Sequence, residues 1–290
     1  MTYLVTGATG KAGRAVVDHL LRAGVRVRAL TRDPGRADLP EQVEVVAGDL
    51  NDPEGLAPAL EGVVGLHLLT AGGDDYATLR TGPELAKLAR RAGVRRVTLL
   101  WNGHVGPVER AFEGSGLEWT RLEAVDFMSN TLTWAESVRS EGVVREPFAD
   151  VPTAVVDEAD VGAVAAAVLV RGGHGGRSYS VTGPQALTPR QRLATIAEVT
   201  GRELGFVELS EEQARERWRA AGHDEELIEI LASWHGSPPA AAFTVVPTVR
   251  EITGREPGTF AAWAARHAEL FAAEAAGQEG VVQEGAAGPR

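Results

Sequence analysis

The sequence predicts an α/β protein in which a doubly wound, mostly parallel sheet is followed by a smaller, largely helical lobe. Two observations predict this class. Short apolar runs alternate with amphipathic helical segments over residues 1–125, and beyond them the alternation weakens into mainly helical patterns. Because strands that alternate with helices form parallel sheets covered on both faces, the first part is expected to be one such sheet domain.

The first strand runs into a glycine-rich turn, residues 7–13, which opens a helix and is followed by a second strand that ends near residue 30. Gly7 permits a sharp exit from the strand, Gly10 lets main-chain amides approach a diphosphate, and Gly13 lets the helix pack closely on the sheet. The free N–H groups and the dipole at the helix start favour an anion, and Lys11 adds a positive charge. The turn therefore predicts a dinucleotide-binding site.

The end of the second strand, residues 31–34, bears on the choice of coenzyme. An acidic residue near this point suits the free ribose 2′-hydroxyl of NAD, whereas an arginine suits the 2′-phosphate of NADP. Arg32 therefore favours NADP(H) over NAD(H). Two alternatives stay open: Arg32 is a solvated loop residue, or the carboxylate of Asp33 accepts a ribose hydrogen bond.

Further strands and helices follow in alternation. Strands are expected at 43–47, 63–69, 96–100 and 117–122, with helices ending near 60, at 75–92 and at 108–114. The carboxyl ends of parallel strands meet at one edge, where cofactors bind. One rim is therefore expected to combine the loops at 7–13, 31–33, 48–50, 70–73 and 101–107.

Beyond residue 125, a short strand is expected at 179–182 and helices at 127–141, 160–171, 189–200, from 211, 224–234 and 259–273. Thr188 and Ser210 are placed to cap two of these helices. We predict a dinucleotide-binding domain at 1–125 and a mixed substrate lobe at 126–273, some of whose segments return to the main sheet. Residues 274–290 lack large apolar side chains and are expected to be a disordered tail.

Composition excludes several classes of protein. A net charge of -11 without a basic run disfavours nucleic acid as a partner. The absence of cysteine excludes disulfides and thiolate metal sites, and the scattered histidines show no metal-ligand spacing, so we predict no metal. Without a signal peptide or an apolar stretch of spanning length, the sequence predicts a soluble cytoplasmic protein that does not enter a membrane.

The chain resembles the NmrA-like type of atypical short-chain dehydrogenase/reductase, a family of NAD(P)-binding Rossmann proteins. The resemblance extends over about residues 1–272 and rests on the glycine turn and on ordered blocks at 31–34, 48–50, 108–111, 115–120, 127–130, 160–164, 179–184, 248–255 and 260–263. It implies NADP(H), or less favourably NAD(H), bound across the rim. The residues that it implies are Gly7, Thr9, Gly10, Lys11, Ala12 and Gly13 at the diphosphate, Arg32 at the 2′-phosphate, Asp49 and Leu50 at the adenine, and Thr70, Ala71 and Gly72 along the ribose.

The tyrosine and lysine that form the proton relay of typical short-chain dehydrogenases have no counterpart here. Tyr76 and Arg80 have the right spacing, but they follow the fourth strand rather than the fifth, and arginine cannot give up a proton. They are interpreted as a pair on a helix surface. His67 lies within an apolar strand and is interpreted as a hydrogen-bonded core residue.

Four side chains remain at the mouth of the expected site. Asn102 is suited to hold the nicotinamide amide or a substrate carbonyl, Trp101 to stack on a flat substrate, and His104 to donate a proton, with Glu109 close by in sequence. The plain alternative for His104 is an exposed loop histidine. Aromatic and thioether side chains further along are expected either to line a flat apolar pocket or to form the core of the lobe; these are Phe127, Met128 and Trp134.

These features favour an NADPH-dependent oxidoreductase that reduces a planar conjugated carbonyl, such as a quinone or an enone. Hydride delivery to such a substrate leaves a delocalised charge, so a strong general acid matters less than for an isolated ketone. The alternative is a non-catalytic dinucleotide sensor that regulates a partner protein. A sugar-nucleotide epimerase or dehydratase ranks last, because that chemistry needs the missing tyrosine and lysine.

Overall fold

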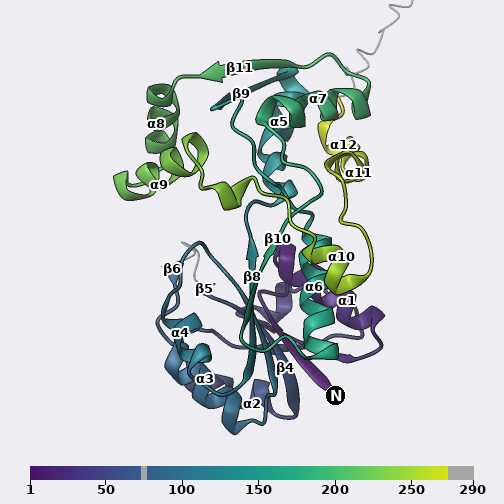
Figure 1. Cartoon of the computed structure of the whole chain (residues 1–290), viewed down its shortest axis with the longest axis vertical. Helices are drawn as coiled ribbons and strands as arrows, with labels where there is room; N and C mark the ends of the chain where they lie inside the picture. The colour runs from purple at the N-terminus through teal and green to yellow at the C-terminus, as the bar shows by residue number, and fades with distance from the viewer. Residues whose placement is uncertain (73–76, 274–290) are drawn as a thin grey trace, which may run out of the picture.

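The computed structural model describes residues 1–72 and 77–273. Its main sheet has seven strands in the order β10-β8-β7-β4-β1-β2-β3, and all neighbouring strands are parallel. The strand order runs one way from β1 and the other way from β4, which confirms the doubly wound α/β fold. Figure 1 shows this part of the molecule below the mainly helical lobe. The strands are β1 (Thr2–Thr6), β2 (Arg26–Thr31), β3 (Glu44–Ala47), β4 (Val63–Leu69), β7 (Arg96–Leu100), β8 (Glu118–Ala124) and β10 (Arg177–Val181).

Helices cover both faces of this sheet, and the alternation of side chains along β1 shows how. Tyr3 and Val5 belong to the apolar core shared with α1 (Lys11–Arg22) and α6 (Glu158–Arg171). Leu4 belongs to the opposite core, shared with α3 (Gly82–Arg91) and α4 (Pro107–Glu113). Successive side chains of a strand point to opposite faces, so β1 is buried along its whole length. Three short helices lie in the connections after β2 and β3, namely η1 (Pro34–Arg36), η2 (Pro53–Leu56) and α2 (Ala57–Leu60).

The segment after β4 differs from expectation. The helix expected at 75–92 begins only at Gly82, where Pro83 suits the first turn of a helix. Before it, β6 (Ala77–Thr78) pairs antiparallel with β5 (Ala71–Gly72), so part of the expected loop is a small hairpin. Residues 73–76, which include Tyr76, and the predicted tail at 274–290 lie outside the described residues.

The lobe is mostly helical, as expected, but it also holds a sheet that the sequence did not predict. β9 (Val143–Pro147) pairs in parallel with β11 (Gly205–Leu209). The helix expected at 127–141 begins as a 3₁₀ helix, η3 (Met128–Trp134), and continues as α5 (Ala135–Glu141). The other helices are α7 (Pro189–Thr200), α8 (Glu211–Ala220), α9 (Glu225–Gly236), η4 (Ala240–Ala242), α11 (Phe260–Arg266) and α12 (Ala268–Phe271).

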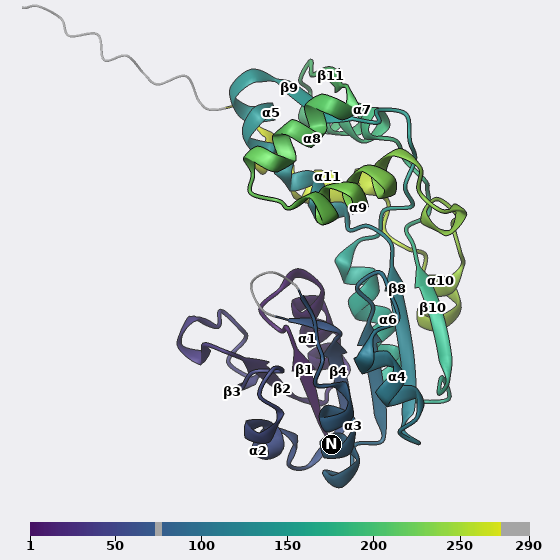
Figure 2. The ribbon, with the colours of Figure 1, turned by 90° about the vertical axis from the view of Figure 1, so that its left-hand side faces the viewer.

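The lobe lies on the side of the sheet to which the carboxyl ends of the strands point (Figure 2). The chain returns from the lobe to the main sheet, where β10 pairs with the outer edge of β8. There α6 packs against α1, and α10 (Thr248–Thr253) packs against α6. Across the described residues, every helix is too short or too polar to cross a lipid bilayer.

Candidate functional site: a dinucleotide groove at the sheet edge

The glycine turn has the conformation that its sequence predicts. Gly7 has a φ of 61°, in the left-handed region that favours glycine, and the amide of Gly10 donates a hydrogen bond of 2.9 Å to the Gly7 carbonyl. A Cβ atom at Gly10 would lie 3.3 Å from that carbonyl oxygen, and one at Gly13 would overlap it. The turn is therefore a cradle of bare main chain directly before α1, which fits a diphosphate held by amide groups.

A cavity of about 360 Å³ opens in front of this turn. Its walls come from the carboxyl ends of β1, β2 and β4 and from the loop after β3, which places it where the strand order of the sheet reverses. Most of the residues predicted to contact the coenzyme line it, namely Gly7, Thr9, Gly10, Arg32, Asp49, Leu50, Ala71 and Gly72. Thr31 and Gly48 also line it and lie in two of the expected rim loops. The sequence did not single out Thr6, Leu30 or Leu69, although each adjoins a predicted residue or ends a predicted strand.

Other predicted coenzyme residues lie beside the groove rather than in its lining. Ala12 and Gly13 are buried under the turn, and Lys11 is exposed at the start of α1. The buried Thr70 donates its hydroxyl to the Leu100 carbonyl at 3.1 Å, so this side chain holds β4 to β7. Trp101 and Asn102 follow the end of β7.

The structure distinguishes the two side chains that bear on coenzyme choice. Arg32 lines the groove. The carboxylate of Asp33 instead accepts a hydrogen bond of 3.1 Å from the Gly35 amide and caps η1. One carboxylate oxygen of Asp33 is thus engaged in its own turn, whereas Arg32 places a cationic side chain at the groove.

At the mouth of the site, Thr78 brings together two of the predicted catalytic residues. Its Oγ1 lies 2.9 Å from Nε2 of His104 and accepts a hydrogen bond of 3.3 Å from Nδ2 of Asn102. All three lie toward the surface, on β6 and on the loop after β7. Sequence reasoning missed Thr78, because the short strand that carries it was not predicted.

Glu109, the third predicted catalytic residue, is fully buried in the first turn of α4. Its Oε2 accepts a hydrogen bond of 2.9 Å from the Gly106 amide. The Glu109 side chain thus fixes the end of the loop that carries Asn102 and His104. Gly106 is tightly placed there, since a Cβ would lie 2.9 Å from Cγ2 of Thr78.

Two side chains considered for a flat apolar pocket belong to the core of the lobe instead. Met128 is 1% exposed and Trp134 is 6% exposed, and both pack in the apolar cluster of the lobe. The Trp134 indole donates a 3.0 Å hydrogen bond to Glu146. The guanidinium carbon of Arg192 lies 5.2 Å from the centroid of the Trp134 ring. Arg192 also faces Asp126 at 3.6 Å, and burial lowers the pKa of the guanidinium. This network ties the lobe to the exit of β8.

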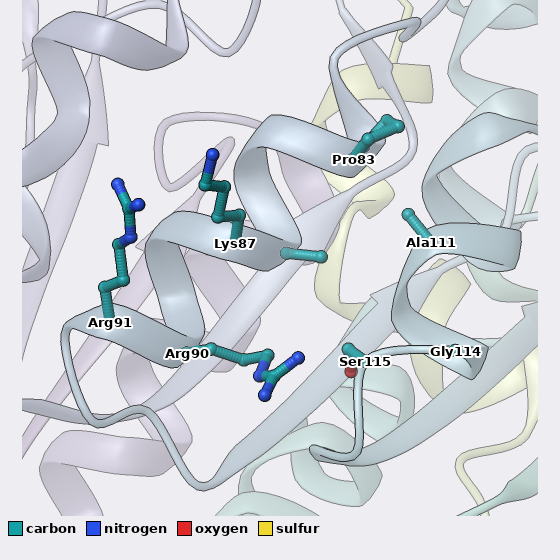
Figure 3. A pocket seen from close by; sticks show the side chains of 8 residues that line it. Pro83, Lys87, Arg90, Arg91, Ala111, Gly114 and Ser115 are labelled. Atoms are coloured by element: carbon teal, nitrogen blue, oxygen red, sulfur yellow. The ribbon is translucent and has the colours of Figure 1, made fainter.

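A larger hollow of about 600 Å³ lies between α3 and α4. Figure 3 shows Arg90 extending from α3 toward the turn of Gly114 and Ser115, with Lys87 and Arg91 on the same helix. None of its lining residues ends a strand of the main sheet. This hollow is therefore separate from the groove in front of the glycine turn.

Fold and groove together define a dinucleotide-binding α/β protein. Residues 1–105 match the model of the NmrA-like family. The chain is also 41% identical over 285 residues to the (4-alkanoyl-5-oxo-2,5-dihydrofuran-3-yl)methyl phosphate reductase of Streptomyces griseus, an alignment that covers 93% of this chain and 99% of that protein. The chain belongs to the NmrA-like family, which confirms the resemblance inferred from its motifs.

Two further similarities extend over the same length. The NAD(P)H azoreductase of Xenophilus azovorans is 32% identical over 288 residues, with 93% of this chain and 99% of that protein covered. The structure of an NADPH-dependent quinone oxidoreductase from Escherichia coli, complexed with NADPH, superposes with a TM-score of 0.77 at 25% identity, covering 92% of this chain and 99% of that one.

Proposed function

We propose that this protein is an NADP(H)-dependent oxidoreductase that reduces a planar conjugated carbonyl compound. The observation that carries the proposal is the groove at the reversal point of the sheet, where a glycine cradle precedes α1 and Arg32 is one of the lining residues. Three reductases similar to this chain over nearly its whole length support a catalytic role.

The substrate class follows from the chemistry that these relatives share. The name of the first describes a lactone ring whose double bond is conjugated with the ring carbonyl and with an alkanoyl group, and which carries a phosphate ester. The other two are named for azo compounds and quinones, which are also flat conjugated hydride acceptors. We propose an alkanoyl-substituted unsaturated lactone as the leading substrate class, with quinones as simpler surrogates.

The proposed mechanism assigns a task to each side chain at the site. A bound reduced nicotinamide supplies the hydride. The amides of the glycine turn hold the diphosphate, and Arg32 holds the 2′-phosphate. His104 donates a proton to the reduced substrate. The Thr78 hydroxyl, whose Oγ1 lies 2.9 Å from Nε2 of His104, holds the imidazole ring of His104 in place.

Asn102 orients the substrate carbonyl or the nicotinamide amide, and Trp101 provides a flat surface for the substrate. Glu109 acts through the main chain, because its bond to Gly106 fixes the loop that carries Asn102 and His104. Negative charge that spreads over a conjugated system needs less stabilisation by a strong acid, which agrees with the absent tyrosine and lysine pair.

Single-turnover kinetics test this proposal. Protein loaded with NADPH is mixed with a 4-alkanoyl unsaturated lactone, with or without its phosphate, with a naphthoquinone, or with cyclohexanone as an isolated ketone. We expect loss of nicotinamide absorbance with the conjugated compounds and none with cyclohexanone. If the protein binds NADPH but none of the conjugated compounds oxidises the bound coenzyme, the protein is a dinucleotide sensor and the catalytic proposal is wrong.

The same assay separates His104 from other surface histidines. His104→Gln is expected to slow the turnover by about 10²-fold, the lower end of general acid catalysis, because the charge is delocalised. His223→Gln, at an exposed turn before α9, is the matched control and should retain the full rate. Equal rates for both variants would remove His104 from the mechanism.

A further inference from the structure

We propose that dinucleotide binding at the glycine turn is coupled to protonation of Glu158, a buried carboxyl group in the first turn of α6, beside the start of α1. The inference rests on the proposed coenzyme function. It assigns a role to a buried carboxyl group that neither the sequence motifs nor the proposed mechanism uses.

The placement of Glu158 follows from the topology of the sheet. α1 leads into β2 and α6 leads into β10, and both strands are parallel to the rest, so both helices begin at the carboxyl edge. The two helices touch one turn from their starts, because a Cβ at Gly162 would lie 2.5 Å from the carbonyl carbon of Ala15. Glu158 and Lys11 precede these contact residues by four positions each. They therefore occupy matching first turns, next to the diphosphate cradle.

The surroundings of the carboxyl group already favour its neutral form. Glu158 is 7% exposed, and burial is the main cause that raises its pKa above the usual range. The negative charge of Asp157, which pairs with Arg266, acts in the same direction. A hydrogen bond from the Ser129 hydroxyl and the positive charge of Lys11 oppose this shift but do not reverse it.

A diphosphate bound at the glycine turn shifts the equilibrium of the Glu158 carboxyl group toward its neutral form. It brings negative charge to the start of α1 and offsets the charge of Lys11, so the ionised form of Glu158 becomes still less favourable. Dinucleotide binding should therefore raise the pKa of Glu158 further and take up protons from solution between the free and bound values. By linkage, affinity should then fall as the pH rises through this window.

Isothermal titration of NADPH into the whole protein, in buffers of different ionisation enthalpy and from mildly acidic to mildly alkaline pH, measures the protons taken up. We expect the wild type to take up as much as one proton and to lose affinity by up to tenfold per pH unit within the window. Glu158→Gln keeps the shape of the neutral side chain. This variant should lose that proton uptake and bind more tightly than the wild type at alkaline pH.

Two further variants complete the test. Ser129→Ala removes a hydrogen bond that favours the ionised carboxylate, so it should move the window to higher pH. Glu136→Gln, the same change in the first turn of α5, should behave as the wild type, which also accounts for protons exchanged by the NADPH 2′-phosphate itself. Ser129→Ala leaves the carboxyl group of Glu158 in place. If Glu158→Gln does not fold, the proton uptake measured with Ser129→Ala therefore tests the role of Glu158.

The outcomes separate this inference from the proposed function. Binding of NADPH with the same proton uptake in the wild type and in Glu158→Gln would overturn the role of Glu158 alone. An unshifted window in Ser129→Ala would also count against it. Absence of NADPH binding in every protein would overturn both the inference and the proposed function.

Discussion

His67 is a fully buried histidine on β4, at the centre of the sheet. Its Nδ1 lies 2.8 Å from the Thr98 hydroxyl, and its Nε2 has no hydrogen-bond partner among the described residues. Burial lowers the pKa of His67 to about 4, so the ring is neutral at physiological pH. This confirms the prediction of a core histidine, which the sequence supported because an apolar strand surrounds the residue.

This depressed pKa makes folding stability depend on pH. Between the ordinary value of 6.5 and about 4, the unfolded chain binds a proton at His67 and the folded chain does not, so the free energy of unfolding should fall as the pH is lowered. His67→Asn should reduce this dependence by up to one proton, or about 1.4 kcal/mol per pH unit. Urea unfolding across this range measures it.

The comparison between variants isolates His67 from other groups. Burial raises the pKa values of Glu158 and Asp160, which act in the opposite direction on the pH dependence in every protein measured. His223→Asn changes an exposed histidine and should leave the dependence unchanged. A pH dependence that is the same in His67→Asn and in the wild type would show that His67 is not neutral in the folded protein.

At the scale of elements, the contact between α1 and α6 fixes one wall of the site. Gly162 lies against the main chain of Ala15, where a Cβ would lie 2.5 Å from the carbonyl carbon and 2.6 Å from the oxygen. Main chain cannot move aside as the end of a flexible side chain does. The two helices therefore have to separate if position 162 carries a side chain.

Gly162→Ala tests this contact. Alanine ordinarily stabilises a helix interior by about 1 kcal/mol over glycine, but here the overlap should win and lower the free energy of unfolding by about 1–3 kcal/mol. Gly35→Ala is the control, because its Cβ would meet only Asp33 Oδ1, at 3.5 Å. Denaturant midpoints measure both changes. A stabilised Gly162→Ala variant would mean that the helices are further apart than described.

The sequence predicted the elements whose signals are local. Thr188 caps α7 as expected, and the capping box of Ser210 with Gln213 starts α8 as expected. It missed β9 and β11, since each strand is short and its partner lies about 60 residues away in the chain. It also missed β6, which gains its structure from pairing with β5 and from the approach of Thr78 to His104. Such contacts between distant segments leave no local pattern.

For the whole molecule, the groove and its mouth differ in how well the sequence predicts them. The groove was predictable because parallel strands bring their carboxyl ends to one edge, so residues far apart in sequence can be grouped by counting strands. The mouth was less predictable. Asn102 and His104 were identified from their loop, but Thr78, which contacts both, comes from an unpredicted hairpin.

The proposed function requires a groove that selects NADP(H), the dinucleotide with a 2′-phosphate, over NAD(H). Arg32, which lines the groove, is proposed to supply that selectivity, whereas Arg36, four residues further along, is exposed and does not line the groove. Arg32→Ala should therefore lose most of the preference for NADP(H) over NAD(H), and Arg36→Ala should keep it.

The most direct measurement is the thermal shift that NADP(H) and NAD(H) produce in the wild type, in Arg32→Ala and in Arg36→Ala. A ligand that binds only the folded state stabilises it by RT ln(1 + [L]/Kd), so at equal coenzyme concentrations the larger thermal shift reports the higher affinity. We predict a larger shift with NADP(H) in the wild type and in Arg36→Ala, and nearly equal shifts for both coenzymes in Arg32→Ala. Equal shifts in the wild type, or no shift with either coenzyme, would contradict the account.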